Sequence, residues 1–193
     1  MLKLRVTYGY ARAKQYYKNR KEKVMKKKVA IVGFGSRGQM FATRIRDEER
    51  LELVAIAEPF EAARKVGINQ YGLPETMCFK SAEEFFAQGK ICDAIFLCTQ
   101  DAQHKEMAIK AMELGYDMLL EKPAACNIED CIEIRDTANR LGRKIMLTHG
   151  LRYAPFFRYI KQLIMDGASI ISVWVKRMLL WQVVPKRLFV QVV

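Results

Sequence analysis

The sequence has few residues of the types that bind metals or build disulfide frameworks. It contains two histidines, His104 and His149, and five cysteines without a Cys-x-x-Cys pair. Metal sites need His and Cys ligands at short, regular spacings, so we expect no bound metal. An odd number of scattered cysteines favours reduced thiols and a cytoplasmic protein.

Long apolar runs are also missing. No run approaches the roughly 20 residues of a membrane span. Residues 1–24 are basic and tyrosine-rich, without the apolar core of a secretory signal. We therefore expect no membrane partner. A strand begins directly after Met25, which favours Met25 as the true start and residues 1–24 as a non-native or disordered basic extension. A native basic tail or targeting peptide is the alternative.

The net charge of +12 is concentrated at the two ends of the chain. Residues 1–28 contain eleven Lys and Arg with one acid, and residues 167–193 contain four with none. Residues 29–166 carry 18 basic and 20 acidic side chains. A nucleic-acid-binding domain carries its basic face on the folded part. We therefore expect no specific nucleic-acid partner, and the alternative is non-specific contact through the polybasic ends.

The strongest motif is a glycine-rich turn after a short apolar strand. Residues 29–32 precede Gly33-Phe34-Gly35-Ser36-Arg37-Gly38, which has the glycine spacing of a dinucleotide-binding turn. The first glycine permits the tight turn, the second lets a pyrophosphate approach, and the third lets the helix pack on the strand. The following helix N-terminus attracts phosphate. The alternative is a tight turn without a ligand.

Strands and helices alternate from residue 25 to about 148. This order predicts a parallel sheet with right-handed crossovers, which is a doubly wound, Rossmann-like α/β fold. Strands are expected at 28–33, 51–57, 77–79, 91–98, 117–121 and 144–147. Helices are expected at 37–48, 60–66, 82–88, 102–114 and 128–141. The expected helix caps are Gly67, Ser81 with Glu84, Asn127 and Gly142.

Ligands of such sheets bind beyond the carboxyl ends of the strands. The polar strand ends are 33–38, Glu58, 99–104, 121–123 and 148–153. Glu58 lies 20 residues after Gly38, where a carboxylate accepts hydrogen bonds from ribose hydroxyls. A solvated acid is the alternative. A carboxylate there repels a 2′-phosphate and favours NAD, whereas Arg37 and Arg64 could offset the repulsion and admit NADP.

Several motifs in order resemble those of the Gfo/Idh/MocA oxidoreductases. They are Gly33 to Gly38, Ala57-Glu58-Pro59, Thr99-Gln-Asp101-Ala-Gln-His104, Met118-Leu-Leu-Glu121-Lys122-Pro123 and Arg152-Tyr153-Ala-Pro155. The likeness covers residues 25–167. It implies an NAD- or NADP-dependent enzyme that moves a hydride between the nicotinamide and a sugar, cyclitol or related polyol. It also implies a homo-oligomer for the full-length form.

The same resemblance implies a role for each motif residue. The 33–38 turn holds the pyrophosphate and Glu58 the adenosine ribose. Thr99 and His104 line the cofactor crevice, with a capping or surface histidine as the alternative. Glu121 and Lys122 lie at the nicotinamide end, and Lys122 is the expected catalytic cation, which polarises a reacting hydroxyl or carbonyl. Without the resemblance, Lys122 would be a surface lysine.

The likeness to the family ends near residue 167. Residues 149–193 are expected to begin a second, α+β substrate and oligomerisation domain, and Arg152 and Tyr153 contact substrate or pack there. Residues 170–173 resemble its first strand, but residues 174–193 show no clean period. We hypothesise a frameshift or premature end near 168–176, which leaves a truncated chain that binds NAD(H) weakly and turns over little. A non-catalytic dinucleotide-sensing module is the alternative function.

Overall fold

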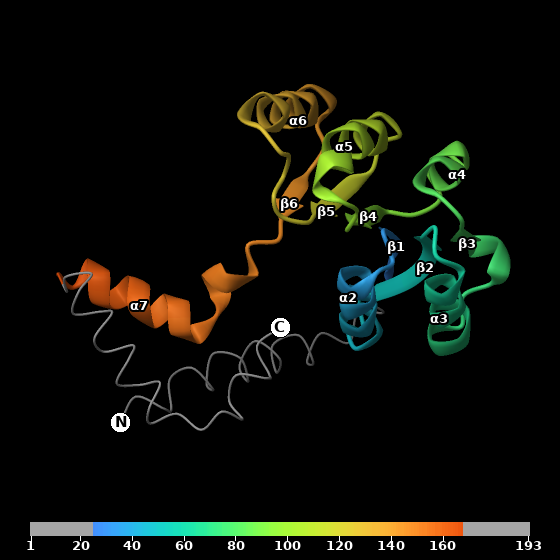
Figure 1. The fold of residues 1–193 in the computed structure, drawn as a ribbon, viewed down its shortest axis with the longest axis horizontal. Helices are drawn as coiled ribbons and strands as arrows, with labels where there is room; N and C mark the ends of the chain where they lie inside the picture. Colours follow the sequence, from blue (N-terminus) through green and yellow to red (C-terminus); the bar gives the residue numbers. More distant parts are fainter. Residues whose placement is uncertain (1–24, 168–193) are drawn as a thin grey trace. The chain divides into compact units, whose positions relative to one another are not determined.

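The computed structural model describes residues 25–167. The expectations for residues 1–24 and 168–193 lie outside these described residues. Six strands form one sheet in the order β3-β2-β1-β4-β5-β6 (Figure 1), which confirms the predicted Rossmann-like α/β fold. The described residues divide into two compact units, and the boundary falls between Ile95 and Phe96, within β4 (Ala94–Leu97).

The first unit surrounds the strand that leads to the glycine turn. Its elements are β1 (Lys27–Val32), α2 (Ser36–Arg46), β2 (Leu51–Ala57), α3 (Glu61–Tyr71), η1 (Glu75–Met77), β3 (Cys78–Phe79) and α4 (Ala82–Ala87). β1 pairs with β2 and β2 with β3, both in parallel. Helices α2 and α3 lie on one side of these strands and α4 on the other (Figure 1). Residues 29–32 are at most 2% exposed, as expected for a strand covered on both faces.

The second unit places two helices against its strands. Its elements are η2 (Asp101–Gln103), α5 (His104–Glu113), β5 (Asp117–Leu120), α6 (Ile128–Leu141), β6 (Ile145–Leu147), η3 (Gly150–Tyr153) and α7 (Pro155–Met165). β5 and β6 pair in parallel. Lys105 ties α5 to α6 through Asp130 (2.9 Å) and Glu133 (2.8 Å). The hydrogen bond to Glu133 contributes most, and that to Asp130 next, to raising the pKa of the Lys105 ammonium.

The helix caps agree with the sequence except at one glycine. Asn127 accepts the Asp130 N–H at 2.8 Å, Ser81 accepts the Glu84 N–H at 3.2 Å, and Gly142 ends α6. The prediction that Gly67 ends its helix is wrong. α3 continues to Tyr71 and ends at Gly72, which has φ 68°. Gly67 is instead a packing residue, because a Cβ there would overlap the Ile56 side chain.

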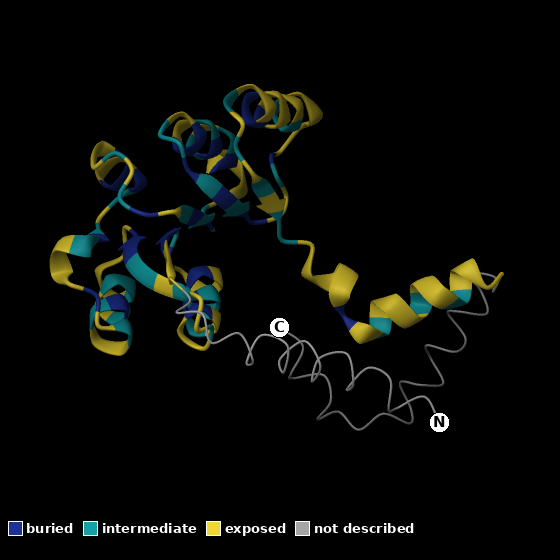
Figure 2. Ribbon diagram, turned by 180° about the vertical axis from the view of Figure 1, so that it is seen from behind, coloured by how far each residue is buried: buried dark blue, intermediate teal, exposed yellow. Residues whose placement is uncertain are grey.

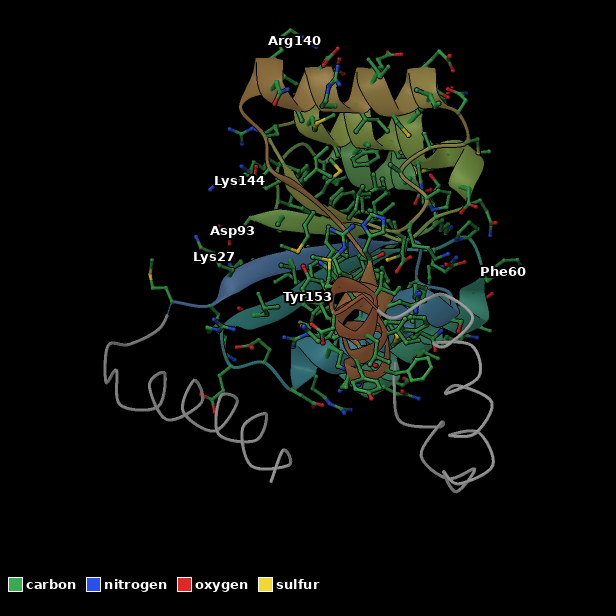
Figure 3. The ribbon with its side chains drawn as sticks, turned by 90° about the vertical axis from the view of Figure 1, so that its left-hand side faces the viewer. Lys27, Phe60, Asp93, Arg140, Lys144 and Tyr153 are labelled. Atoms are coloured by element: carbon green, nitrogen blue, oxygen red, sulfur yellow. The ribbon has the colours of Figure 1, made fainter. Side chains whose placement is uncertain are left out.

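Strand β4 is shorter than the expected strand 91–98. It begins at Ala94 because Asp93 turns its carboxylate toward the start of β1, where it accepts the Lys28 N–H at 2.8 Å. The Lys27 ammonium lies 3.2 Å from the same carboxylate (Figure 3). Asp93 therefore anchors the first residues of β1 rather than extending β4.

Helix α7 buries none of its side chains (Figure 2). Phe157 is 42% exposed, Ile164 48% and Met165 73%. Among residues 25–167, no helix combines the length and apolar character needed to cross a bilayer. The same residues contain no cluster of three or more His, Cys, Asp or Glu arranged to hold a metal ion.

Candidate functional site: the strand-end loops

The glycine turn in the first unit is joined directly to the end of β2. Gly33 has φ 89°, a left-handed conformation that favours glycine. Its N–H donates to the Ala57 carbonyl at 2.8 Å, which places the turn beside the residue that precedes Glu58. A Cβ on Gly38 would overlap the Gly33 carbonyl oxygen. The turn and the start of α2 therefore approach each other as closely as the spacing predicts.

The start of α2 is open to an anion. No heavy atom of the described residues lies within 4 Å of the position that a Cβ on Gly35 would take. Ser36 and Arg37 are exposed. The first turn of α2 contains no acidic residue, and no side chain caps it. The N–H groups in the first turn of a helix beside open space fit a pyrophosphate, so the residues present suit a dinucleotide.

Phe34 belongs to the core of the first unit. Its side chain is fully buried and packs edge-on against Tyr71, with ring centroids 5.9 Å apart. Its carbonyl accepts a hydrogen bond from the Gln39 side chain at 3.2 Å. Any contact of Phe34 with a cofactor must therefore come from its backbone, while the ring anchors the turn.

Glu58 follows β2 and is 5% exposed. Its Oε1 accepts the Phe60 N–H at 3.2 Å. The Arg64 guanidinium lies close by, but its Nη1 donates to the backbone carbonyls of Glu58 (2.7 Å) and Pro59 (2.6 Å). The cation therefore fixes the turn, and the carboxylate keeps lone pairs for ribose hydroxyls.

Thr99 and His104 lie together in the second unit. His104 opens α5 two residues after the expected start of that helix, and at 1% exposure it is not a surface residue. Its Nδ1 lies 2.7 Å from the Pro123 carbonyl oxygen and its Nε2 lies 3.2 Å from that of Thr99. The Thr99 hydroxyl oxygen is buried and has no hydrogen-bond partner among the described residues. An unpaired buried hydroxyl is an unfavourable arrangement that a ligand can relieve.

Glu121 and Lys122 directly follow β5. Glu121 is 5% exposed, whereas Lys122 is exposed. The Lys122 N–H donates to Glu121 Oε2 (3.0 Å) and to Thr148 Oγ1 (3.3 Å). The lysine backbone is thus held while its side chain reaches solvent. Sequence reasoning marked Thr148 only as the end of a strand and missed this bond.

The parallel sheet, the glycine turn and the buried acid after β2 are the features of a dinucleotide-binding Rossmann domain. The family described as an oxidoreductase family with an NAD-binding Rossmann fold matches residues 27–149. The chain therefore belongs to the Gfo/Idh/MocA oxidoreductases, as the motifs indicated.

Two relatives of the chain are named for a glycosyl hydrolase family and for inositol dehydrogenation. An inositol 2-dehydrogenase/D-chiro-inositol 3-dehydrogenase of Lactiplantibacillus plantarum is 26% identical over 72% of this chain and 40% of its own length. A glycosyl hydrolase family 109 protein of Bacteroides fragilis is 27% identical over 73% of this chain and 34% of its own.

A solved structure shows the same relationship. Scyllo-inositol dehydrogenase of Lactobacillus casei, with bound NAD(H) and scyllo-inositol, aligns with a TM-score of 0.65 and 25% identity. The alignment covers 74% of this chain and 42% of that one. The chain thus spans less than half the length of the relatives that it matches here.

Proposed function

We propose that this chain is the NAD-binding half of an oxidoreductase that moves a hydride between a nicotinamide cofactor and a carbon–oxygen centre of a sugar, cyclitol or related polyol. The observation that carries the proposal is the joined arrangement in the first unit. The glycine turn, its open helix N-terminus and the buried Glu58 carboxylate follow two paired strands. Residues 33–38 bind the pyrophosphate through backbone N–H groups, and Glu58 accepts the ribose hydroxyls.

NAD is the proposed cofactor rather than NADP. A 2′-phosphate would meet the Glu58 carboxylate, and the Arg64 guanidinium is engaged by two backbone carbonyls. Turning Arg64 toward a phosphate would leave those two carbonyls without these bonds. This arrangement supports a preference for the unphosphorylated ribose.

Lys122 is the proposed catalytic residue of the second unit. A bound nicotinamide would supply the hydride chemistry. The Lys122 ammonium would bind the reacting oxygen of the substrate and stabilise negative charge that develops there. Because Glu121 and Thr148 hold the Lys122 backbone N–H, the backbone of Lys122 is fixed and only its side chain moves the ammonium. Thr99 offers its hydroxyl to the cofactor, and Glu121 and His104 hold backbone around it.

Residues 149–193 are proposed to begin the substrate and oligomerisation domain. The exposed apolar side chains of α7 support this boundary, because a helix with such a face normally packs against another element. The activity of the whole protein depends on that domain, since hydride transfer needs a substrate held against the nicotinamide with water excluded.

The test is a fluorescence titration of the 193-residue chain with NADH and with NADPH. We expect tighter binding of NADH. Glu58→Gln keeps an acceptor oxygen but removes the charge. It should therefore weaken NADH binding about tenfold and reduce the preference for NADH over NADPH. Glu52→Gln, an exposed change on β2, the strand that Glu58 follows, is the matched control and should bind NADH like the wild type. Tighter binding of NADPH by the wild type would contradict the proposal.

A dinucleotide-sensing module is the alternative. A sensing module and an enzyme would give the same NADH and NADPH binding, so a second experiment separates these two functions. The chain joined to a complete second domain is incubated with NAD and a panel of sugars and inositols, and NADH formation is followed by absorbance. Formation that disappears in Lys122→Met supports the enzyme, and binding without formation on any substrate supports the sensor.

A further inference from the structure

One buried ring contacts the backbone of two loops in the second unit. His104 lies at the start of α5, and its two ring nitrogens meet the carbonyl oxygens of Pro123 and Thr99 at 2.7 and 3.2 Å. Thr99 follows β4, and Pro123 lies three residues after the last residue of β5. The ring is therefore enclosed between the two strand-end loops and α5.

The chemistry of these partners defines what the ring can do. A carbonyl oxygen accepts hydrogen bonds and donates none, and a neutral imidazole carries a single N–H. The shorter contact is that of Nδ1, so we assign the single proton to Nδ1, which then donates to Pro123, while Nε2 contacts the Thr99 oxygen without a hydrogen bond. Because His104 is 1% exposed, water cannot readily replace this donor when the ring is removed.

Both loops carry groups proposed to meet the ligand. Thr99 has a buried hydroxyl without a partner among the described residues. Pro123 follows Lys122, whose backbone N–H is already fixed by Glu121 Oε2 and Thr148 Oγ1. The Glu121 N–H also donates to Leu97 O of β4 at 2.9 Å. The His104 contact thus fixes the one end of the 121–123 segment that these other bonds leave without an anchor.

We propose that His104 is a positioning residue that holds the Lys122 segment and the Thr99 loop in the geometry required at the nicotinamide end of the cofactor. It acts through the Nδ1–H hydrogen bond to the Pro123 carbonyl and through packing of the ring against the Thr99 loop, and it does not itself contact the ligand. This inference rests on the proposed function, because it assumes that the chain binds a nicotinamide dinucleotide. Its effect is confined to the loops that the ring contacts.

The test compares two ligands, NADH and ADP-ribose, which lacks the nicotinamide. Phe replaces the ring without any donor, and Gln restores N–H donors. His104→Phe should weaken NADH binding about tenfold, because a buried acceptor loses its partner. ADP-ribose binding should stay within about twofold, because its proposed contacts lie in the first unit. His104→Gln should recover part of the NADH affinity. Glu106→Gln, exposed on α5, is the matched control.

An equal loss of both ligands in His104→Phe, or no loss of NADH, would overturn the proposal. So would the absence of recovery in a folded Gln variant. A measurement on the wild-type chain does not depend on any variant folding. Imidazole ¹⁵N shifts should show a protonated Nδ1, and an unprotonated Nδ1 would overturn the proposal. If wild type binds neither ligand, the proposed function fails, and the ¹⁵N shifts alone then decide the placement of His104.

Discussion

The two units shape their strand-end loops by opposite means. In the first unit the glycine turn depends on the absence of side chains. Gly33 has φ 89°, and Gly38 packs where a Cβ would overlap the Gly33 oxygen. In the second unit the 121–123 segment depends on side chains that bind backbone, namely Glu121, Thr148 and His104.

These two arrangements should respond differently to mutation. A turn formed by missing Cβ atoms is sensitive to added methyl groups. A loop held by side-chain bonds is sensitive to changes at distant positions, since Thr148 is 26 residues from Lys122 and His104 is 19 residues from Pro123. The loops of the first unit should therefore be disrupted by an added methyl group. Those of the second unit should be disrupted by the loss of a single hydrogen-bond donor or acceptor.

The largest expected effect is that of Gly38→Ala. The new Cβ would overlap the Gly33 oxygen and lie 3.1 Å from the Ile31 side chain. Both neighbours are rigid, so we expect a loss of about 2 kcal/mol in the free energy of unfolding. NADH binding should be lost as the turn shifts. Urea denaturation and the NADH titration measure the two effects.

Gly35→Ala is the matched control for that change. Gly35 has φ −69°, which alanine adopts freely, and its Cβ position is open. The free energy of unfolding should change by less than about 0.5 kcal/mol, while NADH binding weakens because the methyl occupies the phosphate approach. Equal destabilisation by both alanines would remove the distinction between packing and ligand space within this turn.

Most of the fold follows from local patterns in the sequence. The strands and helices alternate with clear periods, and the caps of α6 are set by residues a few positions apart. Gly67 was misjudged because a glycine within a helix and one at its end have the same local signal. Its actual reason is contact with Ile56, a residue of another element.

The site was predictable to the extent that it depends on spacing. The glycine turn and Glu58 follow from intervals along the chain, whereas Glu121 and Lys122 depended on the family resemblance. The contacts of His104 with Pro123 and of Thr148 with Lys122 join elements that no spacing relates. Side-chain bonds to distant backbone carry no local sequence signal, so the second unit was the harder one to interpret.

Arg64 is one of the first unit's residues that depart from this contrast. Its guanidinium binds the Glu58 and Pro59 carbonyls, much as His104 binds the Pro123 carbonyl in the second unit. Arg64→Met should weaken NADH binding about fivefold, because the turn that carries Glu58 loses two bonds. Lys65→Met, beside it in an exposed pair with Glu61, should have little effect. Isothermal titration with NADH compares the two variants, and equal affinities would show that the turn that carries Glu58 keeps its shape without the Arg64 bonds.

Thr148→Val tests the second unit by removing the side-chain acceptor of the Lys122 N–H. Valine has nearly the same shape but cannot accept the Lys122 N–H, so we expect a loss of about 1 kcal/mol in the free energy of unfolding. Thr148→Ser keeps the hydroxyl and should recover most of it. The Lys122 amide should show faster hydrogen exchange in the valine variant only. Unchanged exchange would mean that Glu121 alone holds this N–H.

The smallest expected effect is that of Asp93→Asn in the first unit. The Lys28 N–H, and after it the Lys27 ammonium, hold the pKa of the Asp93 carboxyl below its usual range. Because the folded pKa is the lower one, the carboxylate stabilises the fold above the unfolded pKa of about 3.9, and this contribution is lost as the pH falls below it.

The pair is exposed, and asparagine still accepts the Lys28 N–H. The advantage of wild type at neutral pH should therefore be about 0.5 kcal/mol or less and should vanish in acid. Urea denaturation at a series of pH values measures this advantage. Asp117→Asn is the comparable change in the second unit, because the Asp117 carboxylate also accepts a backbone N–H, that of Lys144, at 3.0 Å. Suppose that Asp93→Asn lowers the free energy of unfolding more than Thr148→Val does. Side-chain bonds to backbone would then stabilise the first unit at least as much as the second, and the contrast between the units would apply to the glycine turn alone.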